Sequence, residues 1–291
     1  MKYTLVCVLP ILCSLAHSDT LTVIEEFQAP CPRPWGLAWD GTHIWVSDDS
    51  LGRISMVDNA GTCIDSMEIS VGNLRGMTFY QNSLWVISST GSGFLFQIDT
   101  DNKTIIDTVD IQRCCPLWGV SFWNSKCYIS YDGGYGSCMY EFDLMNGTRK
   151  KLCCAHPGAL TTIRDVLWCV RMGRGDGAGR YVMPLTIEDE WSDEEWELRH
   201  DLGFFAMGIT YDGHHIWLCD RNAGKIKKME KMGAGDVNGD GIIDILDAVV
   251  AINIMLGTIE PTPDQVWLAD MNGDGGVDIL DVVEIIEEIL G

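Results

Sequence analysis

The sequence predicts a mainly β protein: a five-bladed β-propeller closed by an N-terminal strand, followed by a small α-helical module that binds calcium. Two observations support this fold class. A β-rich motif recurs five times between Leu21 and Glu230, and an acidic loop followed by a helical pattern occurs twice near the C-terminus. The 291 residues leave room for one large domain and one small one.

The repeated motif reads as a strand, a tight turn, and a second strand that carries a tryptophan or tyrosine. Its clearest copies span residues 36–48 and 208–220, and weaker copies begin at Gly76, Gly119 and Ala159. Successive copies start roughly 40 to 50 residues apart, the length of one four-stranded propeller blade. The aromatic position, which we interpret as packing between blades, holds Trp45, Trp85, Tyr128, Trp168 and Trp217.

The fifth repeat is one strand short, because no fourth strand follows residues 224–229 before the acidic loops begin. An unpaired sheet edge at that point would be unfavourable. Residues 21–27 form a strand-like segment outside the repeats. We therefore predict that this N-terminal strand pairs into the last blade and closes the ring.

The C-terminal segment contains two calcium-loop patterns, at residues 236–247 and 270–281. Oxygen-bearing side chains stand at loop positions 1, 3, 5, 9 and 12, position 6 is glycine, and position 7 offers its backbone carbonyl. Position 12 is aspartate, a shorter side chain than the usual glutamate. The predicted ligands of the first ion are Asp236, Asn238, Asp240, Ile242, Asp244 and Asp247. Those of the second ion are Asp270, Asn272, Asp274, Gly276, Asp278 and Asp281. The sequence thus predicts two bound Ca²⁺ ions.

A helical pattern follows each loop, over residues 248–256 and 282–290, and each ends at a glycine. From Gly235 onward there are 13 acidic residues and no lysine or arginine. Such charges repel one another without cations, so calcium should be needed to order this module. The net charge of −22 and the lack of a basic patch argue against a nucleic-acid partner.

The duplicated loop-and-helix unit lacks the entering helix of an EF-hand and resembles the dockerin domain over residues 235–291. This resemblance implies attachment to a cohesin-type scaffold or cell-surface partner. Dockerins recognise their partner largely through a hydroxyl-bearing pair at loop positions 10 and 11. Here those positions are apolar, and the implied partner-binding residues are Ile245, Leu246, Ile279 and Leu280. The alternative is that the calcium module is only a structural cap on the propeller.

The first residues have the pattern of a secretory signal peptide, with Lys2, an apolar run over residues 3–15, and small residues before a cut after Ser18. We therefore predict a signal peptide at 1–18, a propeller at 19–232, the dockerin-like domain at 235–291, and a secreted protein without a membrane span. The ten cysteines outside the signal favour disulfides, and Cys127 and Cys138 could bridge one hairpin.

The propeller sequence, with WGLAWDG at 35–41 and IWVSD at 44–48, resembles extracellular propellers of the NHL, lactonase and glutaminyl cyclotransferase-like group. The resemblance implies a fold rather than an activity. A cyclotransferase would place a glutamate before the Gly-Leu strand start. The corresponding places here hold Trp35, Arg75, Trp118, Gly158 and Met207.

A propeller face lined by Trp35, Arg75, Trp118 and Met207 could hold a sugar ring or an extended peptide, or these residues could serve packing alone. We predict a secreted calcium-binding protein whose propeller recognises a glycan or peptide and whose dockerin-like module attaches it to a cohesin-type partner. The alternative is a scaffold-delivered enzyme, either a polysaccharide-degrading hydrolase or a cyclotransferase-like propeller. No nucleophile motif or phosphate loop supports the enzyme.

Overall fold

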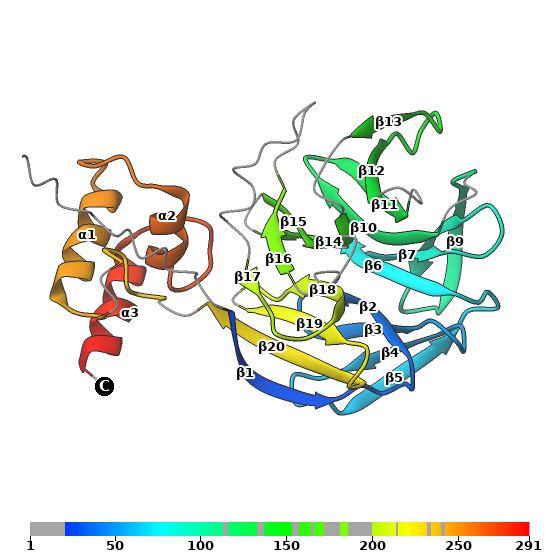
Figure 1. Cartoon of the computed structure of the whole chain (residues 1–291), viewed down its shortest axis with the longest axis horizontal. Coiled ribbons are helices and arrows are strands. Elements are labelled where there is room, and N and C mark those ends of the chain that lie inside the picture. The colour runs from blue at the N-terminus through cyan, green and yellow to red at the C-terminus, as the bar shows by residue number, and fades with distance from the viewer. Residues whose placement is uncertain are drawn as a thin grey trace, which may run out of the picture.

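The computed structural model describes residues 21–112, 116–132, 137–152, 157–163, 166–171, 181–185, 200–213, 215–231, 234–239 and 242–290. These residues form five four-stranded antiparallel sheets and three C-terminal helices (Figure 1). The predicted fold class is confirmed: a five-bladed propeller closed by an N-terminal strand and followed by a small helical module. The predicted signal peptide at 1–18 lies outside the described residues.

Each blade is one sheet, and its first strand faces the centre of the ring. Blade 1 comprises β2 (Pro34–Trp39), β3 (Ile44–Asp48), β4 (Arg53–Val57) and β5 (Cys63–Glu68). Blade 2 comprises β6 (Leu74–Tyr80), β7 (Ser83–Ser88), β8 (Phe94–Asp99) and β9 (Thr104–Asp110). Blade 3 comprises β10 (Leu117–Trp123), β11 (Lys126–Asp132), β12 (Ser137–Phe142) and β13 (Arg149–Leu152). Blade 4 comprises β14 (Pro157–Ile163), β15 (Val166–Arg171), β16 (Tyr181–Pro184) and β17 (His200–Asp201). Blade 5 comprises β18 (Ala206–Tyr211), β19 (Ile216–Asp220), β20 (Lys225–Lys231) and β1 (Leu21–Gln28).

The glycine that opens most repeats is required by the close approach of the innermost strands. A Cβ added to Gly36 would lie 2.1 Å from the Arg75 carbonyl oxygen, and one added to Gly208 would lie 2.2 Å from that of Trp35. Gly76 and Gly119 meet the next blade's backbone equally closely. A side chain has no room there, which explains why glycine recurs at this position of the repeat.

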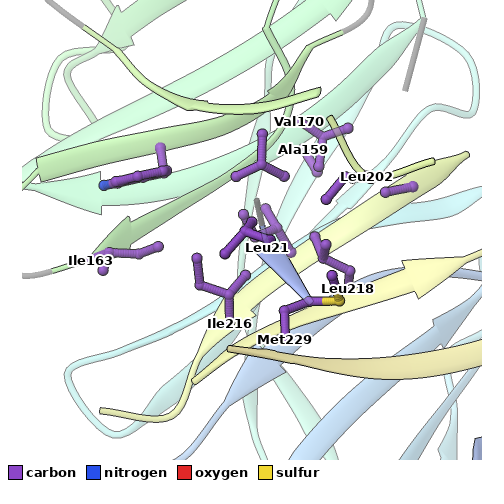
Figure 2. Packing of buried hydrophobic residues seen from close by; sticks show 12 residues of the cluster. Leu21, Ala159, Ile163, Val170, Leu202, Ile216, Leu218 and Met229 are labelled. Carbon is purple, nitrogen blue, oxygen red and sulfur yellow. The ribbon is translucent and has the colours of Figure 1, made fainter. Parts of the chain in front are cut away.

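The predicted closure by the N-terminal strand is confirmed. β1 pairs antiparallel with β20, from Leu21 opposite Lys231 to Gln28 opposite Lys225. The buried side chain of Leu21 lies in an apolar cluster formed by blades 4 and 5, with Ala159 and Val170 on one side and Leu218 on the other (Figure 2). The chain's first described strand therefore completes the last blade and contributes to the core beside it.

The Asp-Gly turns of blades 1 and 5 fix the blade aromatics as well as the strand reversal. The Asp40 carboxylate accepts hydrogen bonds from the backbone N–H of His43 at 2.7 Å and from the Trp45 indole at 2.8 Å. Asp212 accepts from the Trp217 indole at 2.7 Å. All five repeated aromatics are buried, in agreement with their interpretation as packing residues.

The C-terminal module consists of α1 (Ile245–Met255), α2 (Pro263–Ala269) and α3 (Ile279–Leu290). α1 and α3 begin three residues before the predicted helices, and an aspartate that precedes α1, Asp244, caps that helix. The sequence analysis missed α2, although Thr262 and Gln265 form a capping box around Pro263 at its start. The module has a core of its own, formed by Val237, Ala248, Ala251, Ala269, Val282 and Ile285.

α2 lies on the side of the module that faces the propeller (Figure 1), and its Trp267 makes the contact. The Trp267 ring lies 5.7 Å from the Trp168 ring of blade 4 and 6.4 Å from the Tyr211 ring of blade 5, measured between centroids. Trp168 and Tyr211 belong to blades 4 and 5, so aromatic packing holds the module against the last two blades.

The proposed bridge between Cys127 and Cys138 is wrong for this register, because Cys127 lies opposite Phe142 and Cys138 opposite Tyr131. Cys31, Cys127 and Cys219 are buried thiols. Burial raises the pKa of the Cys31 thiol to about 12, and nearby Asp48 acts in the same direction. Within the described residues, no helix is long and apolar enough to cross a membrane.

Candidate functional site

The structure describes the whole second calcium loop, and backbone N–H groups of the loop donate hydrogen bonds to its own aspartate carboxylates. Asp270 at position 1 accepts hydrogen bonds from the backbone N–H of Gly273 at 2.9 Å and of Gly275 at 3.0 Å. Asp281 at position 12 accepts from Asn272 at 3.1 Å and from Asp278 at 2.8 Å. Gly275 has φ +93°, the left-handed conformation that the sharp bend at position 6 requires.

The first loop repeats this pattern. Asp236 accepts from the Gly239 N–H at 2.9 Å, and Asp247 accepts from Asn238 at 2.9 Å and from Asp244 at 2.8 Å. In both copies the aspartate at position 9 accepts the N–H two residues later, at 2.7 Å. The predicted ligand Asp240 and its neighbouring glycine lie outside the described residues.

The donor chemistry of the two loops fits a calcium ion. Asp247 and Asp281 are fully buried, and the module has no lysine or arginine to balance their charge. Asn272 and Asp274 supply further side-chain oxygens, while Ile242 and Gly276 stand where a backbone carbonyl is needed. The amide hydrogen bonds use only part of the capacity of each carboxylate, which has about four lone-pair sites.

Side chains of the second loop hydrogen-bond to the backbone of their own loop. Within the described part of the chain, no group of three or more acidic, histidine or cysteine side chains lies in a metal-binding arrangement. In the second loop, Asp274 instead accepts the Gly276 N–H at 3.0 Å, and Asn272 accepts the Asp274 N–H at 2.8 Å.

Exposed apolar side chains stand at positions 10 and 11 of each loop, which form the first turn of α1 and α3. The exposed fractions are 60% for Ile245, 56% for Leu246, and 57% for both Ile279 and Leu280. The same helices bury other residues, such as Ala248 and Val282, in the module core. The four predicted partner-binding residues thus form two equivalent exposed apolar pairs.

Three of the four predicted propeller-face residues meet at the centre of the ring. The ring centroids of Trp35 in β2 and Trp118 in β10 are 5.5 Å apart. The guanidinium carbon of Arg75, in β6, lies 4.2 Å from the Trp35 ring centroid and 5.4 Å from that of Trp118. Because blades 1 and 3 are not neighbours, this contact crosses the axis of the propeller. Met207, at the corresponding place in blade 5, is buried.

A buried carboxylate, Asp49, joins this group through ion pairs with three arginines. Its oxygens lie 2.9 Å from an Arg221 nitrogen, 3.4 Å from an Arg33 nitrogen and 3.7 Å from Nε of Arg75. The Arg221 guanidinium also lies 4.2 Å from the Trp35 ring centroid. Burial lowers the pKa of Arg75 and of Arg221, and the neighbouring arginines add to both shifts. We call Arg33, Trp35, Asp49, Arg75, Trp118 and Arg221 the axial cluster.

The sequence analysis missed Arg33, Asp49 and Arg221, although the repeat contained a signal for two of them. Asp48 and Asp220 end the second strand of blades 1 and 5, and Asp49 and Arg221 follow them at the same place of the repeat. Because that strand runs antiparallel to the first, its end returns to the strand starts where Trp35 and Met207 lie.

Residues 234–290 match the dockerin type I domain family. This match covers the two loops and three helices, and it supports calcium as the ion and a cohesin as the kind of partner. A search of curated proteins returned no match to the sequence.

Solved structures show the propeller fold. Glutaminyl cyclase from Myxococcus xanthus is 13% identical, with a TM-score of 0.54 over 73% of this chain and 96% of that one. A PQQ-bound aldose sugar dehydrogenase from Streptomyces coelicolor is 12% identical, with a TM-score of 0.49 over 73% and 98%. A streptogramin B lyase is 13% identical, with a TM-score of 0.46 over 71% and 97%. At these identities the likeness concerns the fold alone.

Proposed function

We propose that this protein is an extracellular attachment protein that binds two Ca²⁺ ions and docks to a cohesin-type partner, with the propeller as its recognition domain. The helical module makes the attachment through Ile245, Leu246, Ile279 and Leu280. The dockerin match of residues 234–290 supports this assignment.

The observation that carries the proposal is the pair of exposed apolar patches at the helix starts. Each patch lies at positions 10 and 11 of a calcium loop, and Asp244 or Asp278 at loop position 9 accepts the N–H of Leu246 or Leu280 two residues later. The geometry of the loop therefore sets the first helical turn that displays the patch. Calcium would act by fixing this turn, so docking should depend on calcium.

Binding of the full chain to immobilised type I cohesin domains tests the proposal, in calcium and then in chelator. We expect binding only with calcium. Burying an apolar side chain of this size contributes about 1.5–3 kcal/mol, and a charge placed there must also be desolvated. The double substitution Ile245→Asp and Ile279→Asp should therefore weaken binding at least about tenfold. Both copies must change, because either could supply the contact.

A matched control is Ile106→Asp on β9, an isoleucine that is 55% exposed but lies on the propeller. It should leave cohesin binding unchanged. Equal binding by the double variant and the wild-type chain would refute the assignment of the docking surface.

Aromatic packing favours one second candidate, in which the module caps the propeller. Trp267 joins the module to blades 4 and 5, and a cap would need nothing more. In that case the calcium-loaded chain would be folded yet bind no cohesin. The delivered-enzyme alternative would be favoured by a pair of carboxylates at the axis, whereas Asp49 there is ion-paired with arginines.

A further inference from the structure

We propose that the axial cluster is a binding site for the carboxylate of an acidic sugar, and that the propeller thereby recognises a uronic-acid-containing glycan. This inference rests on the proposed role of the propeller as the recognition domain and adds the chemical class of its ligand. Three features support it: clustered guanidinium groups, a partly exposed indole beside them, and a pocket lined by residues that follow Asp49 in the chain.

The first feature is an excess of arginine over carboxylate among the residues that contact one another. Arg33, Arg75 and Arg221 all pair with the single carboxylate of Asp49. Holding three guanidinium groups together is unfavourable, since each raises the free energy of the other two in the charged state. A second carboxylate, supplied by a ligand, would relieve this repulsion through charge-assisted hydrogen bonds.

The arginines differ in how far they reach solvent, which defines an open side of the site. The Arg33 side chain is 54% exposed, Arg221 is 23% exposed and Arg75 is 16% exposed. Trp35 is buried, and the guanidinium carbons of Arg75 and Arg221 each lie 4.2 Å from its ring centroid, within the range of a cation–π contact. A ligand would therefore meet Arg33 and Arg221 first, while Arg75 and Trp35 form the floor.

Trp118 supplies the second feature, because it is only half-buried. Its indole lies beside the Arg75 guanidinium, with 5.4 Å between the guanidinium carbon and the ring centroid. The apolar C–H face of a sugar ring can pack against an indole while the sugar's carboxylate reaches the adjacent guanidinium groups. The same pair of groups would bind a neutral sugar less well, since only the acid engages the arginines.

The third feature is a pocket of about 290 Å³ that begins one residue beyond Asp49. This volume is near the lower end for small-ligand sites. Ser50, Gly52, Ser70 and Gly72 line it together with the apolar Leu51, Ile69 and Val71. Glu68 lines it as well, and its carboxylate accepts a hydrogen bond from the Arg53 guanidinium at 3.0 Å. Hydroxyl and backbone groups suit the hydroxyls of a saccharide better than they suit apolar peptide side chains, which is why we favour a glycan over an acidic peptide.

Titration of the full, calcium-loaded chain with a matched pair of sugars tests the proposal. Methyl β-D-glucuronoside and methyl β-D-glucoside differ only in the carboxylate at C6, and saturation-transfer NMR with calorimetry detects weak binding of either. We expect the glucuronoside to bind at least about tenfold more tightly than the glucoside, and its affinity to fall as salt is added. An acetylated Gly-Glu-Gly amide serves as the peptide arm.

Two variants assign the binding to the axial cluster. Arg221→Gln should weaken glucuronoside binding about tenfold, and Arg33→Gln should weaken it by a smaller factor. Arg33→Gln also guards against misfolding, because that side chain is already half exposed. The control is Arg149→Gln, an arginine that stacks at 5.4 Å on Tyr140 in blade 3 and should leave binding unchanged.

Equal binding of the two sugars, or glucuronoside binding that neither Arg33→Gln nor Arg221→Gln weakens, would overturn the proposal. So would the absence of glucuronoside binding at millimolar concentration. Binding of the glutamyl peptide alone, with the same arginine dependence, would replace the glycan by an acidic peptide. Cohesin binding measured on the same samples keeps this result separate from the docking assignment.

Discussion

Substituting Gly76 by alanine tests whether the close approach of the innermost strands holds the propeller together. The added Cβ would lie 2.5 Å from the Gly119 Cα, 2.7 Å from the Trp118 carbonyl oxygen and 3.0 Å from the Val120 nitrogen. All three are backbone atoms of strand β10, which is hydrogen-bonded in its own sheet and cannot yield like a flexible side chain. The ring must therefore open locally between blades 2 and 3.

Overpacking of a well-packed core typically costs about 1–3 kcal/mol, and a clash with backbone belongs at the upper end. We therefore expect Gly76→Ala to lower the free energy of unfolding by about 3 kcal/mol. Guanidinium unfolding in saturating calcium, followed by tryptophan fluorescence, measures the change. The flanking Arg75 and the facing Trp118 would move as well, so glucuronoside binding should weaken.

The matched control is Gly72→Ala, four residues earlier in the chain, where an added Cβ meets no atom within 4 Å. It should change the free energy of unfolding by less than about 0.5 kcal/mol. If Gly76→Ala were as mild as this control, the argument that glycine is required at the axis would be wrong.

Four further predictions address closure, calcium, domain contact and pH. Leu21→Ala should lower the free energy of unfolding by about 2–4 kcal/mol, because the side chain is buried between blades 4 and 5. Val23→Ala should have little effect, because Val23 is half-exposed. An equal loss of stability in the two variants would contradict closure of the ring by β1. The far-ultraviolet circular dichroism of the full chain should show more helix in calcium than in chelator. Asp281→Asn should raise the calcium concentration needed for this change at least about tenfold. Identical spectra in both conditions would refute a calcium-ordered module. Trp267→Ala should release the module from the propeller and speed proteolysis of the connection that follows β20. An unchanged cleavage rate would show that the aromatic contact does not hold the module and the propeller together. Burial raises the pKa of the Cys31 thiol from 9.0 to about 12, so its stabilising contribution is complete below pH 9.0 and is lost as pH rises toward 12. The urea midpoint of unfolding should therefore fall over that pH range, and it should fall less steeply in Cys31→Ala. Equal dependence of the midpoint on pH in both proteins would exclude this thiol as a cause.

Much of the fold was predictable because its signals are local or periodic. A tight turn followed by a strand with a buried aromatic recurs with each blade. The strand at Leu21 stood outside that period, and the last repeat lacked one strand. The calcium loops were equally readable, since ligand spacing and the glycine at position 6 are properties of one short segment. The start of helix α2 was also indicated locally, by Thr262 and Gln265. It was not predicted because it lies outside the repeated loop-and-helix unit on which the prediction was based.

The chemistry at the propeller axis could not be obtained in the same way. Asp49 and Arg221 form a 2.9 Å hydrogen bond although 172 residues separate them, and Trp35 meets Trp118 from a blade that is not its neighbour. Their proximity follows from closure of the ring, which brings equivalent points of distant repeats to one axis.

The sequence by itself thus determined the repeat, the closing strand and the positions of the oxygen-bearing residues in the loops, because each depends on spacing along the chain. Only the tertiary structure decided which charged residues share the axial site and which apolar helix residues remain exposed. Those properties depend on how separate repeats and helices pack. Contacts between residues that are distant in sequence leave no pattern in the local sequence.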